Sequence, residues 1–181
     1  MEHRTQRSAG RSKQANAIAL LTADHKKVQQ LFKDFEKLSN GDVAKKDALV
    51  QEACTELTIH AQLEEEIFYP ALREATGERA GGGPLIDEAK VEHATAKDLI
   101  RQLEAMAPGE ELYDAKVTVL GEYVKHHIKE EQGELFAKAR KAKLDLVSLG
   151  QRIAQRKQQL KAEMGVASPG EDDEPTRVKK G

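Results

Sequence analysis

Histidine and glutamate recur four residues apart at two places in this 181-residue chain, first as His60 with Glu64 and again as His127 with Glu131. Residues i and i+4 lie on one face of a helix, so each pair can bind the same metal cluster. Imidazole and carboxylate without thiolate suit iron, manganese, zinc or copper. Two further histidines stand on other helical segments, so the candidate metal ligands are His25, His60, Glu64, His93, His127 and Glu131.

Four segments with helical periodicity carry these residues, and short breakers separate the segments. We expect helices over about 16–38, 42–76, 84–106 and 110–141. Nothing in the sequence has the alternation that is typical of strands. Short links between four long helices predict an all-α fold, an antiparallel up-down-up-down four-helix bundle.

Three details of these helices are predicted from single residues. Asp42 is placed to cap the second helix through its carboxylate. Pro70 lies inside the second helix and predicts a kink or a broken hydrogen bond there. A short additional C-terminal helix is expected over about 144–164, interrupted at Gly150.

A 3-4 spacing predicts which side chains point into the bundle. One histidine interrupts each of the four apolar stripes, and two stripes also carry a glutamate one turn later. The stripes are Ile18, Leu21, His25, Val28, Phe32 and Phe35; Ala53, Leu57, His60, Glu64, Ile67 and Ala71; Ile86, Ala89, His93, Ala96, Ile100 and Leu103; and Val117, Leu120, Val124, His127, Glu131 and Leu135. Ionised carboxylates in an apolar core are costly. Because no Lys or Arg falls in the central layers, a metal cluster is the expected compensating charge.

The number and order of the donors narrow the kind of site. Six inward donors exceed the four ligands of a closed structural zinc site, and two glutamates able to bridge fit two octahedral irons. Ferritin-like bundles use Glu-x-x-His pairs, whereas here the histidine precedes the glutamate. On the fourth helix, His127 rather than His126 shares the stripe of Val124 and Glu131, which assigns His127 to the site.

Composition limits the class of protein. Charged residues make up 33% of the chain and the net charge is −2, so we expect neither nucleic-acid nor membrane binding. Cys54 is the one cysteine, which excludes an intrachain disulfide and is expected to be a small core residue. Without a secretory or membrane-spanning segment, we expect a soluble, cytoplasmic monomer. Its regions are a disordered basic arm (1–15), the bundle (16–142), an amphipathic helix (143–164) and a disordered tail (165–181).

The motifs together resemble the hemerythrin family with its HHE cation-binding domain. They are Ala-Asp-His at 23–25, His-Ala-Gln-Leu-Glu-Glu-Glu-Ile-Phe-Tyr-Pro at 60–70, Glu-His at 92–93 and His-His-Ile-Lys-Glu-Glu at 126–131. The resemblance covers residues 17 to 141 or so. It implies an antiparallel four-helix bundle that holds two irons per chain in an oxo- or hydroxo-bridged centre, with the six ligands given above.

Two positions differ from those of the oxygen-carrying hemerythrins. Lys97 stands where they have a second histidine on the third helix, and the fourth helix offers Glu131 at i+4 instead of an aspartate at i+5. The pattern is more similar to the H-HxxxE-H-HxxxE subgroup. It implies that one iron has an open or water-filled position, or a substitute ligand such as Tyr123 or His126.

Residues around the candidate ligands have simpler expected roles. The flanking acids Glu65, Glu66 and Glu130 are expected to form a solvated face. The basic residues near the C-terminus are likewise expected on a solvated helix face, with a partner or nucleic acid as the minority interpretation; they are Arg152, Arg156, Lys157 and Lys161.

Three functions follow as hypotheses. The first is a non-haem di-iron protein that binds or senses O2 or another small redox species. The second is an enzyme that decomposes peroxide at the open iron position. The third is a metal-free helical interaction module, which would leave the core carboxylates without a counter-charge.

Overall fold

The computed structural model of the chain describes residues 16–77 and 82–166. Within those ranges every regular element is helical, so the predicted all-α class is confirmed. The predictions made for residues 1–15 and for the tail beyond residue 166 lie outside the described residues. In chain order the elements are α1 (Ala17–Glu36), α2 (Val43–Leu63), η1 (Glu64–Phe68), α3 (Tyr69–Thr76), α4 (Gly83–Glu104), α5 (Tyr113–Glu130), η2 (Glu131–Leu135), α6 (Phe136–Lys141) and α7 (Leu146–Glu163).

Two of the long helical stretches contain a π turn that begins at a candidate glutamate. In η1 the Tyr69 N–H donates to the carbonyl of Glu64, and in η2 the Phe136 N–H donates to the carbonyl of Glu131. The bond therefore spans five residues, which adds one residue to that turn. Pro70 is the second residue after η1 and has no N–H to donate, so the disturbance predicted at this proline takes the form of a π turn just before it.

The π turns change which downstream side chains face the core. After η1 the buried residues are Tyr69 and Leu72, whereas the predicted stripe had placed Ala71 there; Ala71 is only partly buried. After η2, Phe136 and Ala139 are buried in the same way. A regular 3.6-residue period cannot predict this change of register.

Several predicted helix limits are corrected by local hydrogen bonding and backbone geometry. Asp42 precedes α2, but its carboxylate makes no cap bond to that helix and instead accepts from the Ser39 N–H and hydroxyl. The fourth stretch begins at Tyr113 rather than near residue 110, because Leu112 has a φ of 69°, outside the helical region. Gly150 does not interrupt α7, which runs through it as one helix.

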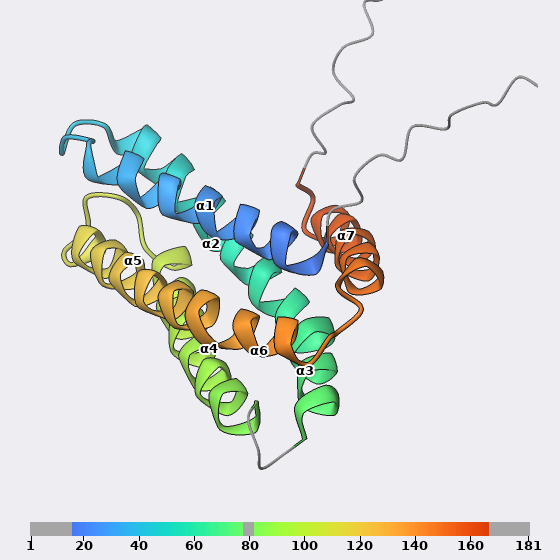
Figure 1. Ribbon diagram of the computed structural model, residues 1–181. Helices are drawn as coiled ribbons and strands as arrows, with labels where there is room; N and C mark the ends of the chain where they lie inside the picture. The colour runs from blue at the N-terminus through green and yellow to red at the C-terminus, as the bar shows by residue number, and fades with distance from the viewer. Residues whose placement is uncertain (1–15, 78–81, 167–181) are drawn as a thin grey trace, which may run out of the picture.

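Figure 1 shows how the helices surround one interior. α1 lies beside α2, and α4 beside α5, while α7 packs across α1 and α2. Gly121 of α5 lets the helix approach α1 closely, because a Cβ there would meet the Phe32 ring at 3.1 Å. Within the described ranges, no helix has both the length and the apolar character needed to cross a bilayer.

The core is divided into two apolar clusters with polar residues between them. One cluster includes Phe68 and Phe136 and continues onto α7 through Ile153. The other includes Tyr113 and the single cysteine, Cys54, which is 3% exposed as expected for a small core residue. The predicted stripes are otherwise close to the observed core, although Phe32, Leu57 and Ala96 are only partly buried.

Candidate metal centre

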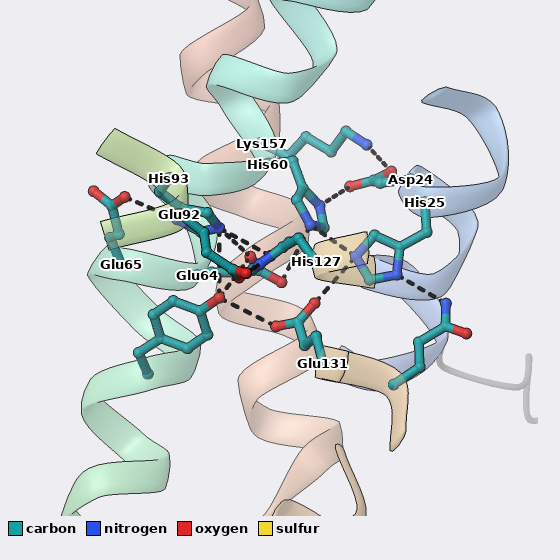
Figure 2. Close-up of polar contacts among 12 residues, drawn as sticks. Asp24, His25, His60, Glu64, Glu65, Glu92, His93, His127, Glu131 and Lys157 are labelled. Carbon is teal, nitrogen blue, oxygen red and sulfur yellow. Dashed lines mark hydrogen bonds and ion pairs between the residues drawn. The ribbon is translucent and has the colours of Figure 1, made fainter. Parts of the chain in front are cut away.

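The structure brings the six sequence-predicted side chains together in the middle of the bundle. Each is at most 8% exposed, and Figure 2 shows them converging from four helical stretches. They come from α1 (His25), α2 (His60), η1 (Glu64), α4 (His93), α5 (His127) and η2 (Glu131).

The first histidine pair is His25 and His60, whose Nε2 atoms lie 3.0 Å apart. Each of these nitrogens has a carboxylate oxygen beside it. Glu131 Oε2 is 3.1 Å from the nitrogen of His25, and Glu64 Oε1 is 3.2 Å from that of His60. Four donors from four different turns of helix therefore surround one position.

The second pair is His93 and His127, whose Nε2 atoms lie 3.1 Å apart. The other oxygen of Glu64, Oε2, is 3.4 Å from the His93 nitrogen. Glu64 thus faces both pairs, one oxygen to each, which is how a carboxylate bridges two metal ions. This second position has three protein donors where the first has four.

The Nδ1 atoms of His93 and His127 point away from the pair, and their partners show which ring nitrogens carry hydrogen. His93 Nδ1 lies 2.9 Å from Glu65, and His127 Nδ1 lies 2.6 Å from Glu92. An ionised carboxylate only accepts hydrogen bonds, so both Nδ1 atoms donate. In the neutral rings, both Nε2 lone pairs then face each other. Two lone pairs at that separation repel unless a cation lies between them, and a carboxylate behind each ring is the usual support of a metal-bound histidine.

The first pair is supported from outside as well. His25 Nδ1 is 2.9 Å from the Gln132 side-chain amide. His60 Nδ1 lies 3.7 Å from Asp24, which is longer than a hydrogen bond. Lys157 of α7 donates to the same Asp24 carboxylate, so a charged residue of the C-terminal helix reaches the layer behind the centre.

The charge balance of the cluster matches a site for a cation. Burial and the neighbouring Glu64 raise the pKa of Glu131 well above its ordinary value. Burial opposes a charged ring at His60, but Glu64 and Asp24 outweigh it and raise the pKa of His60 to about 10. Burial and His60 lower the pKa of His25 to about 3. Protons must therefore supply the positive charge that a metal would otherwise bring, and a metal displaces such protons.

Unpaired buried atoms point to the same conclusion. Asp24 Oδ2, His60 Nδ1, Glu64 Oε1 and Glu131 Oε2 are buried without a hydrogen-bond partner. Buried polar atoms normally have partners. Two of the four are carboxylate oxygens that face the first position, so a cation there would satisfy them.

Tyr69 belongs to this centre, although the sequence pattern did not predict it. Its hydroxyl lies 3.2 Å from Glu64 Oε2, 3.3 Å from Glu131 Oε1 and 3.5 Å from His93 Nε2. Of the predicted substitutes, Tyr123 is 36% exposed and lines the cavity beside the histidine rings, whereas the side chain of His126 is 62% exposed on the surface. Tyr69 is five residues after Glu64, a spacing that shares a face only across a π turn.

Residues expected on solvated faces form ion pairs around the centre. Glu65 binds both His93 and Lys97, with the Lys97 Nζ at 2.7 Å, so Lys97 supports the carboxylate behind His93. On α7, Arg156 pairs with Glu66 at 2.8 Å. The expectation of a solvated basic face is wrong for Lys157 and Lys161, which bind the buried carboxylates of Asp24 and Glu56. Arg152 is exposed, and the ion pair of Arg156 with Glu66 lies at the surface.

A second buried carboxylate lies under α7. Glu56 is 4% exposed and has three lysines near it. Lys27 lies 2.8 Å away, Lys161 3.2 Å and Lys157 3.8 Å. This network attaches α7 to α1 and α2 by buried charge in addition to the apolar contact of Ile153.

A small cavity opens beside the four histidine rings. Its volume is about 40 Å³, which holds a few water-sized particles and no larger organic substrate. The wall is mainly apolar, with Lys97 and Tyr123 among its residues; the apolar part is Val28, Leu57, Ala61, Ala96, Ile100, Val124 and Ile128.

Comparisons with known proteins agree with this geometry. A DNA nickase from Nostoc sp. is 30% identical over 125 residues, which are 69% of this chain and 34% of that protein; the chain spans about a third of its length. A solved structure of a hemerythrin HHE cation-binding domain-containing protein from Mycobacterium kansasii is 25% identical. It superposes with a TM-score of 0.69 over 82% of this chain and 88% of the other. Residues 16–139 match the family described as hemerythrin HHE cation binding domain. The chain belongs to this family.

Proposed function

We propose that the chain is a non-haem di-iron protein that binds O2 or a related small redox molecule. The observation that carries the proposal is the pair of facing Nε2–Nε2 contacts, 3.0 Å in His25–His60 and 3.1 Å in His93–His127, with Glu64 between them. Two pairs of converging imidazole nitrogens, linked by one carboxylate, favour two metal ions over one.

The arrangement of the helices supports the same proposal. Short links join successive stretches, as an antiparallel up-down-up-down bundle requires. In such a bundle each helix contributes one face to a central site. We propose residues 16–142 as the di-iron bundle and α7 as an added helix that covers it.

The ligands divide the two irons into unequal positions. His25 and His60 would hold one iron with a carboxylate oxygen from each glutamate, and His93 and His127 would hold the other with Glu64. When bound, the irons supply reversible electron transfer and coordination of a small ligand. The protein excludes bulk water with its apolar cavity wall and offers the Tyr69 hydroxyl as a hydrogen-bond donor near both glutamates.

The test is metal content followed by exposure to O2. Protein expressed in iron-replete medium should contain about two irons per chain, and the reduced form should change its absorption reversibly when O2 is added and removed. If the protein contained that iron but its absorption did not change with O2, O2 binding would be excluded and only the proposal of a di-iron site would stand. A folded, iron-free protein whose melting temperature ignores chelators would support the metal-free module and overturn the proposal.

Peroxide decomposition is the second candidate. The specific observation in its favour is the Tyr69 O–H, which lies within 3.5 Å of His93 Nε2 beside the position with fewer donors. A hydroxyl there can donate a proton or hydrogen bond to a small oxygen ligand. The protein should release oxygen from added peroxide, and a Tyr69→Phe variant that keeps its iron should not. If the variant still released oxygen, Tyr69 would have no part in the reaction.

A further inference from the structure

A second group of metal-ligating side chains lies on the surface, next to the buried centre. His126 and Glu130 are one turn apart on α5, and Glu92 faces them from α4. His126 Nε2 lies 3.1 Å from Glu130 Oε1 and 3.9 Å from Glu92 Oε1. One donor atom from each of the three lies within 4.8 Å of the others, which is the spacing of a shared cation. We refer to these three residues as the outer triad.

The outer triad is connected to the buried centre through Glu92. Its Oε2 accepts the hydrogen bond from His127 Nδ1 at 2.6 Å, which leaves Oε1 facing His126 on the solvent side. Glu92 is thus the residue that both groups share. Its side chain is only 13% exposed, whereas that of His126 is 62% exposed.

A small acidic pocket continues inward from the outer triad. It lies between α4 and the α5–η2 stretch and has a volume of about 20 Å³, enough for one water-sized particle. Five of its nine lining residues are glutamates, and none is Lys or Arg; the glutamates are Glu88, Glu92, Glu130, Glu131 and Glu134. Its inner end reaches His127 and Glu131, and the unpartnered Oε2 of Glu131 faces the first position of the buried centre.

The two openings toward the centre therefore differ in charge. The cavity beside the histidines has a largely apolar wall whose charged residues are one lysine and two acids, Lys97, Asp24 and Glu92, and it suits a small neutral ligand. The acidic pocket concentrates negative charge at a surface that also offers an imidazole, and such a surface attracts cations.

We propose that the outer triad is a binding site for a hydrated divalent first-row cation, ferrous iron in particular, and that the acidic pocket passes this cation to His127 and Glu131. The inference rests on the proposed function, since it supplies the centre with its metal. Three protein ligands at the surface, one exposed and two partly exposed, leave the remaining coordination positions to water, so the outer site binds weakly enough to release its ion inward. The buried centre, with more donors and no competing bulk water, holds it.

The test is the rate at which the full-length apo-protein takes up Fe²⁺ under anaerobic conditions at low ionic strength. A His126→Ala/Glu130→Gln variant keeps Glu92 and with it the support of His127. Its loading rate should fall about tenfold, because a focused negative field raises association rates by that order or more, while its final iron content should match that of the unmodified protein. Glu36→Gln is the control, because it removes the same charge from an exposed position of α1 that does not line this pocket.

A second measurement detects the outer site directly. Mn²⁺ added to the iron-loaded protein should give one weakly bound ion by electron paramagnetic resonance, and that ion should be lost in the double variant and retained in Glu36→Gln. An unchanged loading rate, or Mn²⁺ binding that does not depend on His126 and Glu130, would overturn the outer site. Failure of the unmodified protein to take up iron at all would overturn the proposed function instead.

Discussion

One histidine of each pair in the centre has a carboxylate and a lysine behind it, and the residues of these two supports come from different parts of the chain. Behind His60 stands Asp24, which is held by Lys157 of α7. Behind His93 stands a glutamate held by Lys97, one turn further along the same helix α4. In both cases an imidazole faces a carboxylate and the carboxylate faces a lysine.

These two supports differ in the helices that supply them and in their imidazole–carboxylate distances. The second is built within the bundle, and its imidazole–carboxylate distance is 2.9 Å, from His93 to Glu65. The first needs α7, which lies beyond the matched family segment 16–139, and its distance is 3.7 Å, from His60 to Asp24. One half of the centre is therefore self-contained, and the other depends on an added helix.

The largest expected effect is the loss of the residue that both halves share. Glu64→Ala removes an oxygen from each position, so the iron content should fall from about two per chain to nearly none. Metal analysis of the purified variant, with circular dichroism to show that it folds, measures this. Glu66→Ala is the matched control, because Glu66 points outward to Arg156; a Glu64→Ala protein with two irons would mean that the halves do not share a ligand.

A chelator should distinguish the two halves in the unmodified protein. The His93–His127 position has three protein donors and the His25–His60 position has four, so about half of the iron should leave in a faster phase. In His93→Ala the fast phase should be missing, because that position no longer fills. A single phase with all the iron released together would show that the positions are equivalent.

The sequence was sufficient for the parts of the centre that a regular helix determines. The spacing of His60 with Glu64, and of His127 with Glu131, places all four side chains inward because i and i+4 share a face. The orientation of His127 rather than His126 toward the interior follows from the same register, and the structure places the two side chains as that register predicts.

The rest required information that no local pattern contains. Tyr69 reaches the centre only because a π turn adds a residue after Glu64, and neither turn has a signature in the 3.6-residue period. The support of His60 requires knowing that α7 folds back over α1, since Lys157 is 133 residues from Asp24. In the sequence, an acid such as Glu65 cannot be told from a solvated surface charge. Only the structure shows that it lies 2.9 Å from an imidazole.

Weakening one support should affect one half of the centre. Asp24→Asn keeps the size of the side chain and removes its charge, so His60 becomes a poorer ligand and the affinity of its iron should fall about tenfold or more. Glu65→Gln makes the same change behind His93 and should lower the affinity of the other iron. Competition with a chelator of known affinity measures both. If either variant weakened both irons equally, the two supports would not be independent.

The smallest expected effect concerns the contribution of α7 itself. Lys157→Met leaves the Asp24 carboxylate buried without its lysine, which should cost about 1 to 3 kcal/mol of unfolding free energy and loosen the iron at His60. Lys161→Met is the matched control, because Lys161 lies one turn after Lys157 on α7 and also binds a buried carboxylate. That carboxylate, Glu56, keeps Lys27 at 2.8 Å and Lys157 at 3.8 Å, and the substitution leaves the Lys157–Asp24 contact in place. Denaturant titrations should therefore show the larger loss for Lys157→Met, and only this variant should release iron faster. Equal iron release from both variants would mean that α7 acts as a general cover over the bundle rather than through the Lys157–Asp24 contact.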